Sequence, residues 1–392
     1  MQQIQVKDRL YFIPELFIQL ISVESSFKTY ESDEIINLNK VFKDIKAGKF
    51  IVITDSKKKF ADKTYKEILK RIDELIPFEE LQRINSKDFS RNRKREHDKI
   101  KTDLFNRLLV ISKNNRLISF DDEEISIPYL ASFCGEDPNL APENIEFLLP
   151  YNFYLELESS LRDKIEIRSL KMNISTGVNV LLPKSQETTE LFKSAFENLQ
   201  IKKDLKVIDM GCGSGVLTLL ADVSIEQSKI YFSDILPEAL ASSIRNIEKN
   251  KNVHFDKTEN RLTCRTENNA ITCLGSGDLF EHTEDKYDII IFNPPWIDSV
   301  SNNRSELALN DKDQKTVGRF LMQAKRRLSN RGRIFLAFSD NSGETAVEKL
   351  DKLIEENKFK SENEYSCRIQ SHQSGRKWMR IFVRVLAVQN EI

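Results

Sequence analysis

The sequence predicts an α/β fold whose carboxy-terminal part is built on a mostly parallel, Rossmann-like sheet, preceded by a mixed α+β amino-terminal domain. Apolar runs typical of buried strands alternate with amphipathic runs typical of helices from residue 205 to residue 356. The first of these strands leads into a turn dense in glycine. Two further strand-like runs, at residues 366–370 and 378–388, are expected to form an antiparallel closing hairpin around Ser374 and Gly375.

Two domains are expected, because 392 residues exceed the usual size of one domain. Prolines between Pro128 and Pro150 interrupt regular structure, so we expect a connection with short helices there, followed by a helix over residues 151–162. We therefore place the boundary near residue 165. Residues 1–165 form the amino-terminal α+β domain, and residues 166–392 carry the glycine-dense turn.

Composition excludes several classes of protein. Hydrophobic residues make up 40% of the chain and the formal net charge is −1, which gives no overall attraction to nucleic acid. No apolar run reaches the ~20 residues that cross a bilayer, and the amino terminus lacks the layout of a signal peptide. We therefore expect a cytoplasmic protein without a membrane partner. Five cysteines without a C-x-x-C pair indicate reduced thiols, and with four scattered histidines they predict no metal site.

The amino-terminal domain is expected to mix strands and helices. Residues 10–20 are apolar enough for a core, residues 49–54 have strand character, and residues 64–76 have the spacing of an amphipathic helix. Residues 86–101 are basic and suit either phosphate contacts or a solvated surface. We favour the solvated surface, because Phe89 is the one aromatic residue interleaved with the charges.

The glycine-dense turn follows a strand over residues 205–210. Gly211, Gly213 and Gly215 let the backbone turn sharply and approach a ligand, and the helix that begins at residue 216 points its free N–H groups at the same place. This pattern predicts a nucleotide-type binding turn, although these glycines alone suit a dinucleotide equally well. Before the turn, Thr188 or Thr189 is expected to cap a helix that runs to residue 199.

The next elements place acidic residues at strand ends. A strand over residues 229–234 ends in Asp234, roughly 20 residues after the glycines, where a carboxylate binds ribose hydroxyls. A helix over residues 237–249 follows. Residues 250–270 suggest an inserted hairpin around 262–266, and the strand over residues 271–274 leads to Asp278.

The most specific signal is a strand over residues 287–292 that ends in Asn293-Pro-Pro-Trp296. A polar stretch over residues 297–315, typical of a mobile active-site loop, comes next. A helix over residues 317–328, a strand over 333–338 and a helix over 344–356 then complete the alternation.

In this order, Asp209-Met-Gly-Cys-Gly-Ser-Gly215, Asp234, Gly277-Asp-Leu-Phe280 and Asn293-Pro-Pro-Trp296 resemble the class I S-adenosylmethionine (SAM)-dependent methyltransferases. More narrowly, they resemble the branch that methylates protein glutamine amides or the exocyclic N6 amine of adenine. The resemblance covers residues 175–388. It implies a class I methyltransferase domain over residues 166–392, with SAM as cofactor and with the amino-terminal domain selecting the substrate.

The resemblance also implies roles for single residues. Gly211 and Gly213 are expected to lie against the methionine moiety, Asp234 to bind the ribose hydroxyls, and Asp278 with Leu279 to border the adenine. Asp209 is expected to order the turn. The expected cofactor-binding set is Asp209, Gly211, Cys212, Gly213, Gly215, Asp234, Ile235, Asp278, Leu279 and Asn293.

The expected catalytic residues are Asn293, Pro294, Pro295 and Trp296. An amide or aromatic amine is a poor nucleophile because its lone pair is delocalised. The carbonyl groups of the Asn293 side chain and the Pro294 backbone accept the two N–H groups and hold the nitrogen in line with a methyl donor. The prolines fix the loop, and Trp296 offers a flat face for stacking.

Several acceptors fit this chemistry. A protein glutamine amide is favoured, partly because residues 177–191 resemble the lead-in of the protein-glutamine methyltransferases. Lys184 and Trp296 depart from the arginine and tyrosine usual in that family, so an RNA or DNA base amine is the first alternative. A small-molecule acceptor or a non-catalytic SAM-binding module is the other. The expected partner is a protein or nucleic-acid substrate.

Overall fold

The computed structural model describes residues 1–31, 38–54, 56–76, 91–120, 125–142, 144–370 and 378–389. The chain divides into two compact units. The first comprises residues 1–136 and 141–159, and the second comprises residues 137–140 and 160–392. Within the described part of the chain, no helix has the length and the apolar character needed to cross a bilayer.

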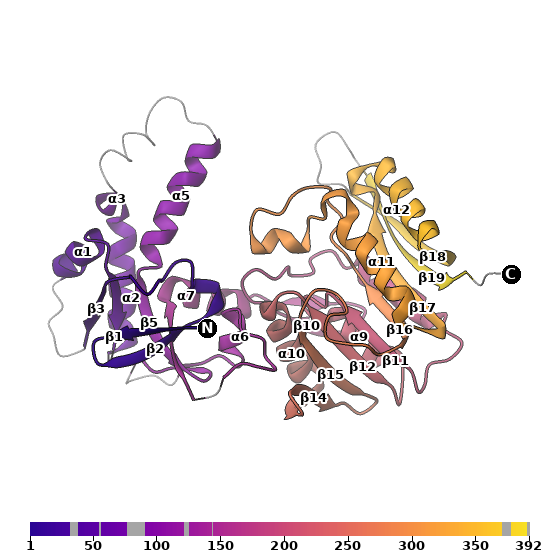
Figure 1. The fold of residues 1–392 in the computed structure, drawn as a ribbon, viewed down its shortest axis with the longest axis horizontal. Coiled ribbons are helices and arrows are strands. Elements are labelled where there is room, and N and C mark those ends of the chain that lie inside the picture. Colours follow the sequence, from indigo (N-terminus) through magenta and orange to yellow (C-terminus); the bar gives the residue numbers. More distant parts are fainter. Residues whose placement is uncertain are drawn as a thin grey trace. The chain divides into compact units, whose positions relative to one another are not determined.

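The first unit is a mixed α+β fold (Figure 1). Its sheet has the strand order β1-β2-β8-β5-β4-β3. β3, β4 and β5 run parallel, and β8 is antiparallel to β5. Its strands are β1 (Gln2–Val6), β2 (Arg9–Ile13), β3 (Phe27–Tyr30), β4 (Phe50–Ile53), β5 (Leu108–Lys113), β6 (Arg116–Leu117), β7 (Ile125–Ser126) and β8 (Glu146–Pro150). Its helices are η1 (Glu15–Phe17), α1 (Leu38–Lys46), α2 (Lys58–Lys70), α3 (Ile72–Leu75), α5 (Arg91–Phe105), α6 (Leu130–Phe133) and α7 (Tyr151–Arg162), the last of which continues into the second unit.

Most expectations for this unit are confirmed, with two corrections. The strand over residues 49–54 is β4, and the helix over 151–162 is α7. The helix expected over residues 64–76 is two helices, α2 and α3, because the backbone leaves helical geometry at Arg71 (φ −112°, ψ 18°). The stretch between Pro128 and Pro150 contains the short helix α6, as expected, but it ends in the buried strand β8. Residues 86–90 of the basic segment lie outside the described residues, and α5 contains the rest.

The second unit is a nine-stranded sheet with the order β13-β14-β15-β12-β11-β16-β17-β19-β18. The central strands β15, β12, β11, β16 and β17 are parallel, and β19 enters antiparallel to β17. The strands of this sheet are β11 (Lys206–Met210), β12 (Lys229–Asp234), β13 (Asp256–Thr258), β14 (Arg261–Arg265), β15 (Ala270–Ser276), β16 (Tyr287–Phe292), β17 (Leu328–Ser339), β18 (Phe359–Gln370) and β19 (Trp378–Val388). A small hairpin of β9 (Ile165–Ile167) and β10 (Met172–Ile174) precedes them.

This topology confirms the predicted fold class, including the closing hairpin of β18 and β19. The inserted hairpin is also present as β13 and β14. The turn expected at Ser374 and Gly375 lies outside the described residues.

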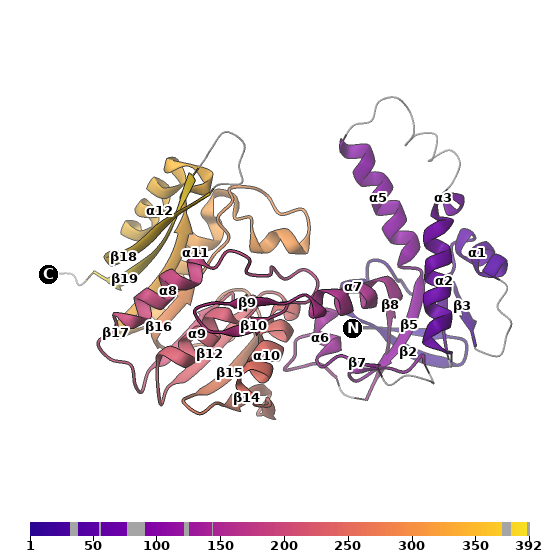
Figure 2. The same cartoon turned by 180° about the vertical axis from the view of Figure 1, so that it is seen from behind.

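Five long helices cover the sheet of the second unit. Figures 1 and 2 show α8 (Glu187–Glu197), α9 (Val216–Ser224) and α10 (Pro237–Lys251) on one face, and α11 (Lys315–Arg327) and α12 (Glu344–Glu356) on the other. The predicted cap of α8 is wrong. Gln186 is the residue before the helix and makes no side-chain cap, whereas Thr188 and Thr189 lie inside the first turn and are buried.

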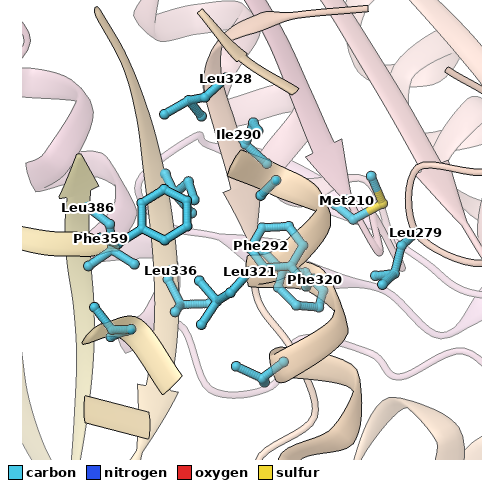
Figure 3. Packing of buried hydrophobic residues seen from close by; sticks show 14 of the residues in the cluster. Met210, Leu279, Ile290, Phe292, Phe320, Leu321, Leu328, Leu336, Phe359 and Leu386 are labelled. Atoms are coloured by element: carbon cyan, nitrogen blue, oxygen red, sulfur yellow. The ribbon is translucent and has the colours of Figure 1, made fainter. Parts of the chain in front are cut away.

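The core beneath α11 and α12 fixes the end of β16. The ring of Phe292, the last residue of β16, lies 4.1 Å from the ring of Phe320 on α11, and Met210 of β11 belongs to the same cluster (Figure 3). Because helices cover both faces of the central strands, β16 is buried along nearly its whole length and reads as a continuous apolar run. The residue after Phe292 therefore starts from a rigid position.

Candidate functional site

Two glycines of the turn between β11 and α9 share a positive φ but differ in their surroundings. Gly213 has a φ of +53° and Gly215 has a φ of +79°, a backbone region that favours glycine. A Cβ on Gly213 would meet no atom within 4 Å, so this residue faces open space. A Cβ on Gly215 would lie 2.9 Å from the Cα of Ser243, because α10 packs directly against the turn.

α10 also fixes the turn through polar side chains that the sequence did not single out. The hydroxyl of Ser243 donates to the carbonyl oxygen of Gly213 at 3.1 Å. The side-chain amide of Asn246 donates to the carbonyl oxygens of Ser214 at 2.9 Å and Ser175 at 2.8 Å. The bonds to Gly213 and Ser214 satisfy carbonyl groups of the turn and hold the turn against α10.

Asp234 ends β12 beside this turn, as the sequence indicated. Its Oδ2 accepts the N–H of Gly213 at 2.9 Å, and its Oδ1 accepts the N–H of Leu236 at 3.0 Å. Burial raises the pKa of Asp234 to about 6, and the two backbone N–H groups oppose that rise. The neighbouring Ile235 side chain is 53% exposed, which leaves an apolar surface next to the carboxylate.

Asp209 lies beneath the turn and not on its open side. The hydroxyl of Thr218 on α9 donates to its Oδ2 at 2.7 Å. Its Oδ1 is buried and has no hydrogen-bond partner among the described residues. Burial raises the pKa of this carboxyl to about 7, and the charge of Asp234 adds to the rise. Asp209 therefore ties α9 to β11 and leaves one buried acceptor free.

The Asn293–Trp296 segment follows the rigid end of β16. Asn293 is exposed, and its carboxamide makes no hydrogen bond within the described part of the chain, whereas Pro294 is buried. The carbonyl oxygen of Trp296 accepts the hydroxyl of Ser342 at 3.0 Å, and the indole packs against the core cluster. The motif thus presents an unengaged carboxamide from a fixed backbone.

One cavity of about 640 Å³ brings the main predicted residues together. This volume is in the range of small-molecule sites. The predicted residues among its walls are Gly211, Cys212, Gly213, Asp234, Asn293 and Trp296. Most of the other walls come from segments that the sequence did not assign to a site. These are residues 179–185, the first turns of α8 and α9, the start of α10 at Leu236 and Ala239, Ala308, and the facing ends of β18 and β19 at Ile369 and Met379.

Other predicted residues do not line this cavity. The carboxylate of Asp278 pairs with Arg319 on α11 and borders a separate surface hollow. Leu279 is buried in the core cluster. Asp209, Gly215, Ile235 and the two prolines stand behind or beside the walls. In the described residues, no three or more His, Cys, Asp or Glu side chains gather as they would around a metal ion.

Comparison with known proteins identifies the domain. Residues 184–366 match the family model described as the methyltransferase small domain. The second unit is a methyltransferase domain. This family implies SAM as the methyl donor. The cavity at the carboxyl ends of β11, β12 and β16 lies inside the matched part of the chain, except for its walls from β18, from β19 and from residues 179–183.

Two kinds of relative share the methyltransferase domain. The release factor glutamine methyltransferase of Lactococcus lactis subsp. lactis (strain IL1403) is 27% identical over 207 residues, which is 48% of this chain and 68% of the relative. The ribosomal RNA small subunit methyltransferase C of Actinobacillus pleuropneumoniae serotype 7 (strain AP76) is 29% identical over 178 residues, which is 44% of this chain and 45% of the relative. The match thus spans less than half of the length of the ribosomal RNA enzyme.

Solved structures also align with part of the chain. The ribosomal protein L11 methylase from Lactobacillus delbrueckii subsp. bulgaricus is 16% identical, with a TM-score of 0.37, and the alignment covers 55% of this chain and 86% of that protein.

Proposed function

We propose that the protein transfers a methyl group from SAM to a planar nitrogen, and that the acceptor is the side-chain amide of a protein glutamine. One observation carries this proposal. The unengaged carboxamide of Asn293 shares a single cavity with the glycine turn and with Asp234. A methyl donor bound at the glycine turn and Asp234 would therefore lie in the same cavity as Asn293, the group that positions the acceptor.

The residues of the turn suit SAM. The open space above Gly213 admits a ligand close to the backbone, and the oxygens of Asp234 have lone pairs left for two ribose hydroxyls. Ile235 offers an exposed apolar surface beside the carboxylate of Asp234. When bound, SAM supplies a sulfonium methyl group that a nucleophile displaces.

The acceptor side suits a flat, uncharged group. The Asn293 carboxamide oxygen accepts one N–H of the acceptor nitrogen, and the carbonyl of Pro294 accepts the other. These bonds orient the lone pair toward the donor. Trp296, Ile369 and Met379 form apolar walls around this position, and such walls exclude water and favour a planar amide over a charged amine.

The relatives support glutamine as the acceptor. The matched part of this chain covers 68% of the release factor enzyme from Lactococcus lactis and 76% of the one from Flavobacterium psychrophilum. The ribosomal RNA relatives keep a base amine as the second candidate. We also propose that the first unit selects the substrate. The cytoplasmic location expected from the sequence is part of the same proposal.

A labelling experiment tests the acceptor. Extract from cells that lack the protein is incubated with the purified protein and tritiated SAM, and portions are then treated with protease or with nuclease. We expect label that protease removes and nuclease does not. Label that nuclease removes and protease does not would show that the acceptor is a nucleic-acid base and not glutamine. If neither protein nor nucleic acid in the extract becomes labelled, acceptors of both classes are contradicted.

The variant Asn293→Ala tests the positioning role in the same assay. Loss of one preorganised hydrogen-bonding group typically slows a reaction by about 10²–10³-fold, so we expect transfer to fall by that factor while SAM affinity changes little. Asn268→Ala is the matched control, because Asn268 is exposed in the turn between β14 and β15 and does not line the cavity. Normal transfer by Asn293→Ala would contradict the assignment.

A further inference from the structure

A strap of residues 297–311 follows the Asn293–Trp296 motif and is closed at its two ends. The N–H of Ile297 donates to the carbonyl oxygen of Leu309, and the N–H of Asp311 donates to the carbonyl oxygen of Ile297, both at 2.9 Å. The carboxylate of Asp311 then accepts two N–H groups at the start of α11. The base of the strap is therefore fixed beside β16 and α11.

The tip of the strap has a defined shape. It contains a short 3-10 helix, η2 (Arg304–Ala308). The side chain of Asn303 accepts the N–H of Glu306 at 3.0 Å, and the carboxylate of Glu306 accepts the N–H of Asn302 at 2.8 Å. These reciprocal bonds order the tip, and they place Ala308 in the wall of the cavity.

Arg304 joins this tip to α10. Its Nε and Nη2 donate to the two carboxylate oxygens of Glu238 at 2.9 and 2.8 Å. The Glu238 side chain is fully buried in the first turn of α10, whereas that of Arg304 is 35% exposed. The side-chain amide of Asn179, which lines the cavity, lies 3.5 Å from the same carboxylate. A bidentate pair of this kind fixes orientation as well as distance.

The pair spans the carboxyl edge of the sheet. The strap starts after β16, and Glu238 follows β12, while β11 lies between these two strands in the sheet. A tie from the strap to α10 therefore crosses the end of β11, where the glycine turn begins. Leu236 and Ala239, on either side of Glu238, line the cavity that the tie crosses.

We propose that the Arg304–Glu238 pair is a clasp that holds the strap across the cofactor site and opens when the cofactor enters or leaves. This inference rests on the proposed use of SAM. Arg304 is a positioning residue in this account, because it acts through the strap and touches no reacting atom.

The clasp has a physical cost when it is broken. Without Arg304, the carboxylate of Glu238 stays buried without its charged partner, and the strap loses its attachment to α10. The strap then spends more time away from the cavity. A bound cofactor is released each time the strap opens, so the main effect is expected on the dissociation rate.

The test measures how fast full-length protein releases tritiated SAM when unlabelled SAM is added in excess. We expect Arg304→Ala to release SAM about tenfold faster than the wild type, and Arg304→Lys, which keeps the charge but loses the bidentate geometry, to lie between them. Glu238→Gln removes the charge without changing the shape of the side chain and should also speed release.

Arg333→Ala is the matched control. Arg333 forms a two-point pair with Glu362 on β18, away from the cavity, so its loss should leave the release rate unchanged. Equal release rates for the wild type and Arg304→Ala would overturn the clasp while the proposed function stands. If the wild type itself retains no SAM, the proposed cofactor fails and the clasp fails with it. Similar melting temperatures for Arg304→Ala and Arg333→Ala would show that faster release does not come from general instability.

Discussion

Asp209 and Asn293 show how differently two polar residues of one site are used. Asn293 stands at the cavity with its carboxamide unengaged, which suits a group that must bind a substrate. Asp209 is buried beneath the glycine turn and holds Thr218, so its first role is to join two elements. The sequence motif contains both residues but does not distinguish these roles, because burial depends on the helices that cover the strand.

The buried carboxyl of Asp209 predicts a dependence of stability on pH. Its pKa is raised to about 7 in the folded protein, against about 4 for an ordinary aspartate. Between these values the folded protein binds a proton that the unfolded chain does not. The free energy of unfolding therefore falls as the pH rises from about 4 to about 7, by on the order of 1 kcal/mol for each pKa unit.

Asp209→Asn should remove this contribution. The amide is neutral at every pH, so the variant should gain stability relative to the wild type between pH 5 and pH 8, as measured by urea unfolding at both values. Asp163→Asn, a change on an exposed residue, is the control and should follow the wild type. An identical pH dependence for Asp209→Asn and the wild type would contradict the raised pKa.

At the scale of elements, the site depends on the contact between the glycine turn and α10. Gly215 packs against the backbone of Ser243, while Gly213 faces open space. Alanine at either position adopts a positive φ at a cost of about 1–2 kcal/mol. At Gly215 the new Cβ also overlaps α10, and overpacking adds about 1–3 kcal/mol.

We therefore expect Gly215→Ala to lower the urea midpoint of unfolding more than Gly213→Ala does. Gly318→Ala is the control, because Gly318 lies inside α11, where a Cβ makes only ordinary contact with Leu353 and alanine favours the helix. That variant should be as stable as the wild type or more so. A larger loss at Gly213 than at Gly215 would mean that α10 does not press on the turn.

The elements themselves were largely predictable, and the contacts between them were not. The alternation of strand and helix patterns fixed β11, β12, β16, α11 and α12 closely, because apolar spacing is a local property. The cap at Thr188 or Thr189 was wrong, since tertiary packing buries both side chains inside α8. Strand β8 was missed because its position after several prolines resembled a connection.

At the scale of the whole molecule, the candidate site is formed by segments that are far apart in the sequence. Asp234 and Asn293 were found from the sequence because Asp234 ends a buried strand and Asn293 directly follows one. The walls from residues 179–185 and from the ends of β18 and β19 were not, and neither was the pairing of Arg304 with Glu238. These contacts join residues far apart in the chain, and no local pattern specifies them.

The central claim is that this cavity binds SAM through the carboxylate that ends β12. Titration calorimetry with SAM at pH 8, where a carboxyl with a pKa of about 6 is ionised, tests it most directly on the wild type, Asp234→Ala and the control Asp256→Ala on β13. Hydrogen bonds to a charged group contribute about 1.5–3 kcal/mol, so Asp234→Ala should bind at least about tenfold more weakly than the wild type and the control. Equal affinity of Asp234→Ala and the wild type, or no binding by the wild type, would contradict the account.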